Sequence, residues 1–440
     1  MKLKHWRLKL LWILIGGSCA ILYLHLILTK PKWKVPICPL VLNNEDVPGA
    51  TFSEVDTVDQ IIPPATGYRV DCAAIMKGDI NAIQLASRYK KCTPRSLSDD
   101  AYAQMTYDCL RFRRIRGYDS YYITPEEKDF PIAFNILTYE NVEQTERLLR
   151  AIYRPQNYYC IHVDENAASN VKAAMTSIAA CFDNVFMVSK PVAVRWSEFE
   201  VLEAEIHCMQ DLVKKPKWKY FINLTGREFP LRTNWELVQI MTAYNGANDI
   251  DGTIFRRPLI WTKYVWRNQN WRTWTEKKPA PDGFLIAKGS THIVATRGFV
   301  EYVVNNKSAH NLLEWMKDIR APDEHFFPTL NHNPHNGIPG SYKENPDLKT
   351  FLARFKIWQS AEENCDGVWW RFICNFGVGD LVRLSTAKEL FANKFRLEFD
   401  SLAFTCAEQW YLNRTRDFKK TQKDFDVGFY QKKPWVTNHV

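Results

Sequence analysis

The sequence predicts an α/β fold built around one central, mostly parallel sheet. From Phe130 onward, short apolar runs alternate with amphipathic runs, which is the pattern of a parallel sheet with crossover helices. The roughly 300 residues of this region fit one α/β domain better than two. Eleven cysteines indicate disulfide cross-links. An apolar run near the N-terminus further predicts a membrane anchor and a stem before the domain.

The predicted strands are apolar runs separated by helix-like segments such as "EQTERLLRAIY", and the clearest are Pro131–Tyr139, Tyr158–Asp164 and Trp218–Gly226. In a parallel sheet, ligands bind beyond the carboxyl ends of the strands. Asp164 ends the second run, so its carboxylate is placed to accept hydrogen bonds from a nucleotide or sugar hydroxyl. The alternative is that Asp164 caps the next helix, and the sequence alone leaves both interpretations open.

The N-terminal region predicts a signal-anchor that is not cleaved. Residues 10–28 read "LLWILIGGSCAILYLHLIL", with His25 as the one ionisable group, and this run is long enough to span a bilayer. A cleaved signal peptide has a shorter apolar region and a small-residue cleavage site. We therefore expect a cytoplasmic tail at residues 1–9 and a stem at residues 29–70. Everything after the span would then be lumenal.

Three further segments follow the stem in this prediction, and no internal repeat is evident. Residues 71–129 form a helical segment that carries cysteines, residues 130–412 form the main domain, and residues 413–440 form a charged C-terminal tail.

Ten cysteines follow the predicted span, and their even number in an oxidising compartment indicates a disulfide framework. No CxxC pair occurs, and no cysteine has a histidine at zinc-ligand spacing. Spacing does not fix the connectivity, although Cys365 and Cys374 are close enough to bridge one loop. Candidate N-glycosylation sites are Asn223, Asn306 and Asn413; because Asn223 lies in an apolar run, burial is expected to hinder its modification.

The net charge of +9 raises the question of nucleic acid binding, but a lumenal domain argues against such a partner. Aromatic residues make up 14% of the chain, with 16 tryptophans, which is unlike a basic disordered tail. Aromatic faces are common in sugar-binding sites, so this composition favours a globular domain that handles sugars.

The usual nucleotide and hydrolase motifs are missing: there is no G-x-G-x-x-G at a strand end, no Walker A loop and no G-x-S-x-G elbow. Asp249 and Asp251 have a D-x-D spacing used for divalent cations, but "YNGANDIDGT" is rich in turn formers, so we interpret it as a turn. Asp424 and Asp426 lie in the charged tail. No metal site is expected.

The stretch "RAPDEHFFPTL" places Asp323 and Glu324 between a proline and aromatic residues. Proline followed by acidic residues is ordinary helix N-terminal chemistry, because free N–H groups and the helix dipole favour negative charge there. A catalytic carboxylate is the other interpretation. The local pattern does not decide between the two.

A set of strings spread along the chain resembles the β-1,6-N-acetylglucosaminyltransferase family, whose members build core 2, core 4 and I branches on glycans. The strings include "FPIAFNILTYE", "WKYFINLTGREFPLRTN", "APDEHFFPTL", "CDGVWWRFICNFGVGDL" and "LFANKF". They occur in family order over about residues 70–410 and include the cysteine placement. The combination is highly specific, although each string alone is weak. The xylosyltransferases resemble the same fold more distantly.

This resemblance implies a type II Golgi membrane enzyme with a GT-A-like fold that inverts the donor anomeric carbon and needs no metal or other cofactor. By analogy the catalytic base is Glu324, and Asp323 supports the helix start. The cations that replace the metal correspond to Arg371 and Lys394. The nucleotide-facing acid corresponds to Asp164, and an aromatic residue of the sugar site corresponds to Trp358.

These implied roles agree with the chemistry of an inverting transfer. A single displacement needs one carboxylate to take the proton of the attacking sugar hydroxyl. The developing charge on a leaving diphosphate needs a metal or fixed cations. A guanidinium such as Arg371 can bind phosphate in a fork, and Lys394 acts as a point charge. Alone, both residues would be interpreted as surface cations whose stems cover apolar area; their coincidence with Glu324 favours the catalytic interpretation.

The resemblance also implies four disulfides and leaves Cys38 and Cys92 without a counterpart; the implied pairs are Cys72–Cys406, Cys109–Cys181, Cys160–Cys208 and Cys365–Cys374.

The acceptor side departs from the family pattern. Trp261 stands where the family has an acceptor-binding arginine, and no glutamate aligns with the family's acceptor glutamate. Ser360 replaces a tyrosine of some members, and Thr225 replaces a free cysteine. A tryptophan can hold the C–H face of a sugar, so a changed acceptor fits the substitution.

Three hypotheses follow. The first is transfer of GlcNAc from UDP-GlcNAc, in β-1,6 linkage, to a galactose- and GalNAc-containing O-glycan on glycoproteins. The second keeps the chemistry and changes the donor, to UDP-glucose or UDP-xylose, or the acceptor. The third is a non-catalytic Golgi glycan-binding protein, which the joint presence of Glu324, Arg371 and Lys394 disfavours. The expected partners are the donor, the acceptor and the membrane, and a homodimer is among the expected assemblies.

Overall fold

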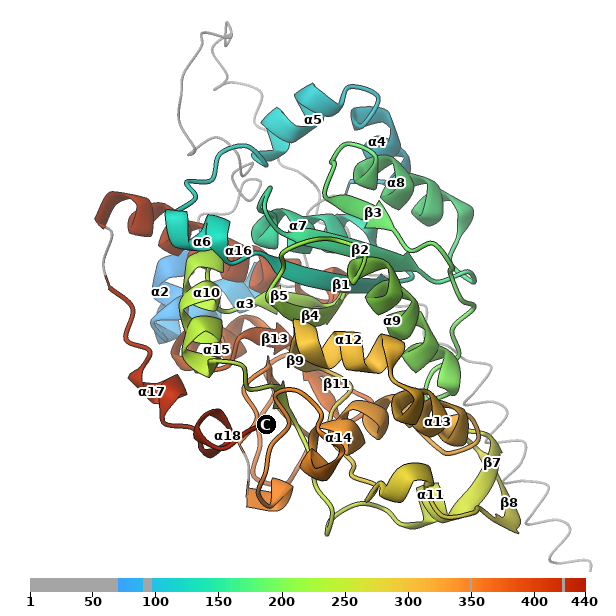
Figure 1. Cartoon of the computed structure of the whole chain (residues 1–440). Coiled ribbons are helices and arrows are strands. Elements are labelled where there is room, and N and C mark those ends of the chain that lie inside the picture. Colours follow the sequence, from blue (N-terminus) through green and yellow to red (C-terminus); the bar gives the residue numbers. More distant parts are fainter. Residues whose placement is uncertain (1–69, 90–96, 349, 422–423) are drawn as a thin grey trace, which may run out of the picture. The chain divides into compact units, whose positions relative to one another are not determined.

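The central element of the fold is a twisted sheet. The computed structural model describes residues 70–89, 97–348, 350–421 and 424–440. In this part of the chain a six-stranded sheet has the order β3-β2-β1-β4-β9-β6 (Figure 1). The strands are β1 (Ile132–Thr138), β2 (Tyr158–Val163), β3 (Val185–Met187), β4 (Tyr220–Thr225), β6 (Asp249–Ile250) and β9 (Ile293–Thr296).

The first four strands pair in parallel, β3 with β2, β2 with β1 and β1 with β4, whereas β9 runs antiparallel to both β4 and β6. The prediction of a mostly parallel sheet is therefore confirmed. The helices that connect the parallel strands are α7 (Val142–Ile152), α8 (Ser169–Ala179) and α9 (Phe199–Leu212).

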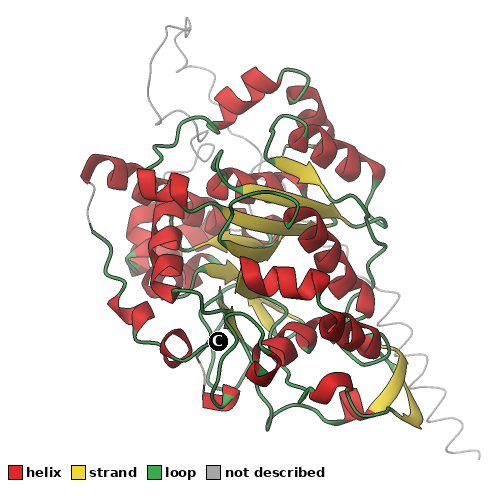
Figure 2. Ribbon diagram, in the orientation of Figure 1, coloured by secondary structure: helices red, strands yellow, loops and turns green. Residues whose placement is uncertain are grey.

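Helices cover both faces of the sheet (Figure 2) because β1 is apolar on both faces. Successive side chains of a strand point to opposite faces. Accordingly Phe134 packs in one hydrophobic cluster with α7 and α8, whereas its neighbour Ala133 packs in a second cluster with α9. Burial on both faces explains why the strands read as nearly continuous apolar runs rather than as alternating ones.

The other helices of the main body follow the sheet or flank it. They are α2 (Cys72–Met76), α3 (Ile80–Tyr89), α4 (Asp99–Met105), α5 (Cys109–Arg116), α6 (Pro125–Asp129), α10 (Asn234–Tyr244), α11 (Ile260–Lys263), α12 (Arg297–Asn305), α13 (Lys307–Met316), α14 (Phe326–Asn331) and α15 (Leu381–Thr386). A one-turn 3₁₀ helix, η3 (Pro322–Glu324), precedes α14.

Three small sheets lie beside the central one and carry most of the candidate site. The first has the order β10-β13-β5, and the other two are the hairpins β11–β12 and β7–β8. Their strands are β5 (Glu228–Pro230), β7 (Tyr264–Asn268), β8 (Trp271–Glu276), β10 (Arg354–Phe355), β11 (Val368–Trp370), β12 (Ile373–Asn375) and β13 (Phe391–Asn393).

Four disulfides link distant segments to this framework. They connect α2 to the C-terminal helix α16 (Leu397–Thr421), α5 to the segment after α8, β2 to α9, and the start of hairpin β11–β12 to its second strand. The pairs are those that the family resemblance implies: Cys72–Cys406, Cys109–Cys181, Cys160–Cys208 and Cys365–Cys374. Cys19, Cys38 and Cys92 lie outside the described residues.

The C-terminal segment packs against the core, although the sequence predicts a charged tail from residue 413. The predicted boundary falls inside α16 (Leu397–Thr421). After it come α17 (Gly428–Gln431) and α18 (Pro434–Thr437). Tyr430 and Trp435 are buried in the hydrophobic cluster of β1, which fixes this segment in place despite its charge.

The interpretation of Asp249 and Asp251 as a turn is wrong. Asp249 lies in strand β6, which pairs with β9, and its side chain is fully buried. Its carboxylate accepts hydrogen bonds from the Tyr244 hydroxyl and the Leu352 amide. Pairing with a neighbouring strand, which the local sequence does not reveal, outweighs the turn preference of Asn, Asp and Gly.

The three sequon asparagines differ in exposure. Asn223 lies in β4 at 2% exposure, and its amide donates hydrogen bonds to Glu205 and to the Thr291 carbonyl. This burial agrees with the expectation that the site is hindered. Asn306 caps α13 and Asn413 lies on α16, and both are partly exposed.

No helix within the described ranges is long and apolar enough to cross a bilayer. The predicted anchor at residues 10–28 and most of the predicted stem lie outside those ranges.

Candidate active site

Glu324 lies at the end of η3 and pairs with a lysine that the sequence analysis did not single out. Its Oε2 atom is 2.9 Å from the Lys288 Nζ atom, and the Glu324 side chain is 33% exposed. The Glu324 carbonyl also accepts a hydrogen bond from the Gly289 amide at 2.8 Å. A carboxylate held by a cation, with part of its surface open, can receive a proton from a bound hydroxyl.

Asp323 lies in the first turn of η3, directly after Pro322, as the helix-start pattern predicts, although no side chain caps η3 or α14. Asp323 is buried, and this burial, together with the nearby charge of Glu324, raises the pKa of its carboxyl to about 7. The two adjacent carboxylates thus have different surroundings, because Glu324 is open to solvent and Asp323 faces the interior.

A second buried acid lies behind η3. Glu205 on α9 is 3% exposed, and its Oε1 atom accepts hydrogen bonds from Asn223 and Thr291. Burial raises the pKa of Glu205 to about 8, and the charge of Asp323 contributes to the rise. Glu205 and Asp323 therefore form a pair of interacting acids that favour their protonated forms.

Arg371 lies at the tip of hairpin β11–β12. Trp370 pairs with Ile373, so Arg371 and Phe372 form the two-residue turn, with φ angles of 51° and 64°. Glycine and asparagine are the usual residues at such positions, because a side chain is strained there. The Arg371 guanidinium lies 4.2 Å from the ring centre of Trp196.

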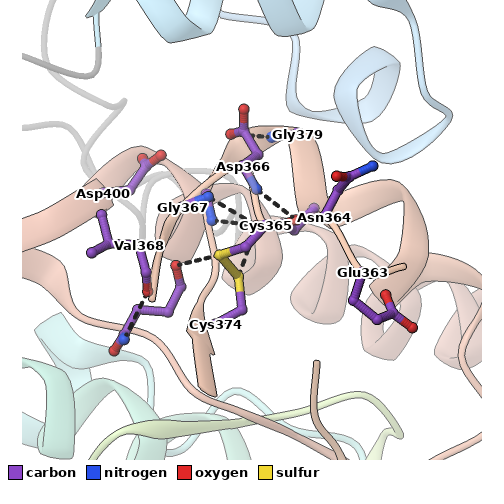
Figure 3. The surroundings of a disulfide bond; sticks show 12 residues. Glu363, Asn364, Cys365, Asp366, Gly367, Val368, Cys374, Gly379 and Asp400 are labelled. Atoms are coloured by element: carbon purple, nitrogen blue, oxygen red, sulfur yellow. Dashed lines mark hydrogen bonds between the residues drawn. A yellow bond between two sulfur atoms is a disulfide. The ribbon is translucent and has the colours of Figure 1, made fainter. Parts of the chain in front are cut away.

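The Cys365–Cys374 disulfide supports this hairpin (Figure 3). Asp380 accepts hydrogen bonds from the amides of Asp366, Gly367 and Gly377, which brace the base of the hairpin. Within the described residues, the two cysteines and Asp380 are the one group at metal-ligand distances. Because both sulfur atoms are in a disulfide, they cannot act as thiolate ligands.

Lys394 directly follows strand β13 and lies in a strongly basic environment. Burial lowers the pKa of its ammonium group to about 8, and the charges of Arg396, Arg371 and Lys356 add to this effect. The Lys394 carbonyl accepts a hydrogen bond from Phe376 at 3.0 Å, which ties it to the segment after β12. Such a group of mutually repelling cations is an anion site, because a bound anion relieves the repulsion.

Lys356 is a further cation of this region, and the sequence analysis missed it. Its Nζ atom donates to Ser290 Oγ and lies 3.1 Å from His292 Nδ1. Burial lowers the pKa of Lys356 to about 8, and the charge of Glu324 opposes this shift. Lys356 thus interacts electrostatically with both Glu324 and Lys394. Nothing in its sequence neighbourhood, "RFKIWQ", distinguishes it from a surface lysine.

A buried charge network fixes the elements that carry these lysines. Glu228 on β5 lies 2.6 Å from His292 and 3.1 Å from Arg354, and it accepts a hydrogen bond from the Asn393 amide at 2.8 Å. Although burial opposes ionisation, the charge of Arg354 and the contact with His292 hold the pKa of Glu228 well below its usual range. One buried carboxylate therefore joins β5, β10 and β13.

Asp164 is not the cap of the following helix. Helix α8 begins after Ala168 without a side-chain capping bond. The Asp164 Oδ1 atom instead accepts hydrogen bonds from Asn166 at 2.8 Å and from Val194 at 3.1 Å. Asp164 is half-buried at the carboxyl end of β2, the edge of a parallel sheet where ligands bind.

The loop of residues 189–198 connects three of the predicted site residues. Its Val194 amide binds Asp164, its Trp196 ring contacts Arg371, and its Ser197 carbonyl accepts a hydrogen bond from Ala321 beside η3. The predicted nucleotide, diphosphate and base positions therefore share one loop. No local pattern in the sequence indicates this loop, because its role depends on contacts with distant segments.

Trp358 lies next to the Arg371 hairpin. It forms an isolated bridge with Ile373 of β12, and its side chain is 54% exposed. The Lys356 Nζ atom lies 5.6 Å from its ring centre. An exposed ring beside the cation cluster can contact the apolar face of a sugar.

Trp261 lies close to the ion pair of the candidate base. The Lys288 Nζ atom that pairs with Glu324 is 5.7 Å from the Trp261 ring centre, and the Arg320 guanidinium is 4.7 Å from it. Ser360 is exposed, whereas Thr225 is partly buried and donates its amide to Glu228. Of the three residues that replace family residues, Trp261 is the one close to the Lys288–Glu324 pair.

The similarity to known proteins agrees with this geometry. A model of the Core-2/I-Branching enzyme family matches residues 132–385. The beta-1,3-galactosyl-O-glycosyl-glycoprotein beta-1,6-N-acetylglucosaminyltransferase 3 of Bos mutus grunniens is 33% identical to this chain, with 93% of this chain and 98% of the relative covered.

The human protein of the same name is 35% identical, with 78% of this chain and 82% of the relative covered. A beta-1,3-galactosyl-O-glycosyl-glycoprotein beta-1,6-N-acetylglucosaminyltransferase of Bovine herpesvirus 4 is 35% identical, with the same shares covered. From the extent and identity of these matches, the chain belongs to the Core-2/I-branching enzyme family.

Proposed function

We propose that this protein is an inverting glycosyltransferase that moves GlcNAc from UDP-GlcNAc, in β-1,6 linkage, to a galactose- and GalNAc-containing O-glycan on glycoproteins. Membership of the Core-2/I-branching family supports the reaction class. The observation that carries the site assignment is the loop of residues 189–198, because its Val194 amide binds Asp164, its Trp196 ring contacts Arg371, and its Ser197 carbonyl accepts a hydrogen bond from Ala321 beside η3.

Glu324 acts as the general base in this proposal. It removes the proton from the acceptor hydroxyl while the hydroxyl oxygen forms a bond to the anomeric carbon of the donor. The bond from that carbon to the diphosphate breaks in the same displacement, so the configuration inverts. The ion pair with Lys288 supports this role, because it holds the Glu324 carboxylate at the surface of η3.

Arg371 and Lys394 neutralise the charge that develops on the leaving UDP. Both contribute to one region of positive potential, since the charge of Arg371 acts on Lys394. Fixed cations can replace a divalent metal, and we propose that the reaction is metal-independent. Asp164 would bind the nucleotide, and Trp358 would contact the donor sugar.

The finer assignments of fold and location belong to the same proposal. The mostly parallel sheet, with antiparallel β9 beside β4, supports a GT-A-like fold. The apolar run at residues 10–28 and the disulfides support a type II Golgi membrane protein with a lumenal catalytic domain.

A changed acceptor is the second candidate, favoured by Trp261. This ring, rather than a charged side chain, lies beside the Lys288–Glu324 pair. An acceptor sugar that presents its hydroxyl to Glu324 would meet an aromatic face there.

The test is product formation by the detergent-solubilised full chain with UDP-GlcNAc and Galβ1-3GalNAc, with and without EDTA. We expect EDTA-resistant transfer, and a loss of about 10²- to 10⁴-fold in kcat for Glu324→Gln, because a general base contributes that much. Glu314→Gln, on the exposed surface of α13, is the control and should retain full activity.

Three results would contradict parts of the proposal. Loss of activity in EDTA would remove the metal-free mechanism. Turnover with UDP-glucose or UDP-xylose but not with UDP-GlcNAc would keep the mechanism and change the donor. Full activity of Glu324→Gln would remove the assigned base.

A further inference from the structure

Hairpin β7–β8 concentrates exposed aromatic side chains on a basic segment. Trp271 and Trp274 are 64% and 77% exposed. Basic residues outnumber acidic ones over residues 263–278, where the one acid is Glu276. The hairpin projects from the lower right of the view in Figure 1. Clustered, exposed tryptophan and arginine side chains are typical of interaction surfaces.

One arginine of the hairpin lies against two aromatic rings that contact each other edge to face. The Arg272 guanidinium lies 4.1 Å from the ring centre of Trp274 and 5.3 Å from that of Tyr264. The Lys263 ammonium lies 5.3 Å from the ring centre of Tyr264, and it also forms an ion pair with Glu276. We call Tyr264, Arg272 and Trp274 the aromatic–arginine stack.

The stack presents an unused anion-binding group. A guanidinium that lies over an aromatic ring keeps N–H groups that can bind a carboxylate. Within the described ranges of the chain, Arg272 and the exposed Arg267 make no ion pair. The rings fix the orientation of Arg272 in advance, so a bound carboxylate would cost little additional ordering.

The base of the hairpin is attached to the segment that leads into the candidate base. The Trp266 amide donates to the Asp318 carbonyl at 2.8 Å, and Lys277 forms an ion pair with the Asp318 side chain. Arg320, on the same segment, lies 5.3 Å from the Trp266 ring centre. A ligand on the hairpin is therefore held in a fixed relation to Glu324.

We infer that the aromatic–arginine stack binds an acidic polypeptide segment that flanks the acceptor glycan. This inference rests on the proposed function. Carboxylates complement the free arginine edge, and peptide backbone and side chains complement the tryptophan faces. Within the described ranges, no hydrogen bond, ion pair or ring contact joins the stack directly to Glu324, so a sugar bound at Glu324 leaves the stack free for a more distant part of the acceptor.

The test compares glycopeptides that carry Galβ1-3GalNAc on one threonine and differ in flanking glutamate, glutamine or lysine. With the full chain at low salt, we expect kcat/KM to be about three- to tenfold higher for the glutamate peptide than for the glutamine peptide. The lysine peptide should be the poorest acceptor. Salt should reduce these differences, because exposed charges are screened.

Variants separate this surface from the catalytic site. Arg272→Glu should reverse the order of the glutamate and lysine peptides, and Trp274→Ala should reduce the preference. Neither should change kcat/KM for free Galβ1-3GalNAc by more than about twofold, since surface changes are usually small. Tyr107→Ala removes an aromatic side chain that is 90% exposed between α4 and α5, and it should leave the order unchanged.

Each contrary outcome has a distinct meaning. If the wild-type protein uses the free disaccharide but ignores the flanking residues, the inference is wrong and the proposed function stands. If it uses no acceptor, the proposed function fails. Binding of the hairpin to vesicles with anionic lipid, or a concentration-dependent dimer lost in Trp274→Ala, with no peptide preference, would assign the stack to a membrane or to a second copy and overturn the inference.

Discussion

On the donor side of the site, the charges that fix the structure are buried, whereas those of hairpin β7–β8 are exposed. Glu228 and Arg354 pair at 3.1 Å with no exposed side-chain surface. On the hairpin, Lys263 and Glu276 pair at 3.1 Å with 53% and 63% of their side chains exposed. The two ion pairs have the same distance but interact with very different strength, because water screens the charges of the exposed pair.

This difference agrees with the proposed roles of the two regions. A diphosphate is common to every turnover, so the cations that bind it benefit from a rigid, preorganised setting. Acceptors vary more than donors, and an exposed surface tolerates variation at small cost in stability. We therefore expect changes on the donor side to affect folding or every reaction, and changes on the hairpin to affect only the choice of acceptor.

The largest expected effect is on stability, from Glu228→Gln. The change leaves Arg354 charged and fully buried, which costs about 3–5 kcal/mol. Urea denaturation measures it. The pKa of Glu228 is lowered in the folded state, so its stabilisation is present above the unfolded pKa and lost only in strong acid. The difference in the free energy of unfolding between the wild type and Glu228→Gln should therefore stay constant from about pH 5 to pH 8.

The matched change on the hairpin is Trp274→Ala, which should alter the free energy of unfolding by no more than about 0.5 kcal/mol, as is usual at exposed positions. Comparable losses in both variants would show that the hairpin is as much a part of the folded core as Glu228.

The two regions also differ in how far the sequence could predict them. The strand runs around β1 and β2 and the strings that carry Glu324, Arg371 and Lys394 are local patterns, so sequence reasoning could identify them. The partner of Glu324, Lys288, comes from a different segment, as does Lys356. Such pairs depend on the tertiary fold, and one sequence without homologues gives no signal for them.

The same reason explains the error at Asp249 and the unforeseen burial of Asp323. Asp249 is in a turn-forming stretch, yet β9 pairs with it and makes it a strand. Asp323 lies in the first turn of η3, as its pattern predicts, but the chain also buries it beside Glu205. Both outcomes depend on contacts between distant segments. The exposed stack of the hairpin, by contrast, lies within residues 264–274 and is visible as a Trp- and Arg-rich run.

The next effect concerns donor binding. Lys394→Met should raise KM for UDP-GlcNAc and lower kcat, with a loss of about 10²- to 10³-fold in kcat/KM, because a buried countercharge to the leaving group is removed. KM for the acceptor should change little. Initial rates with each substrate varied in turn give both constants.

The control is Lys388→Met, an exposed lysine shortly before β13, which should behave like the wild type. Lys394 has a pKa of about 8, so in the wild-type protein kcat/KM for the donor should fall as the pH rises above that value and the ammonium loses its charge. A profile that stays flat to pH 9.5, roughly one and a half units above that pKa, would contradict a role for charged Lys394.

The smallest expected effect concerns a second buried acid, Glu205. Unlike the charge of Glu228, a charge on Glu205 would not stabilise the folded protein. Its folded pKa of about 8 lies above the unfolded value of 4.5, so the folded protein binds more protons between these pH values. Stability therefore falls as the pH rises through this range. Glu205→Gln is neutral at every pH and keeps an amide oxygen that can accept the Asn223 hydrogen bond.

In Glu205→Gln, the fall in the free energy of unfolding between about pH 5 and pH 8 should be shallower than in the wild type, by an amount on the order of 1 kcal/mol or more. Urea titrations at several pH values measure it, with Glu203→Gln on the partly exposed face of the same helix as the control. Identical slopes in the wild type and Glu205→Gln would show that Glu205 is ionised in the folded protein. Asp323 would then lie beside two charged carboxylates, Glu205 and Glu324, with Lys288 as the cation paired to Glu324.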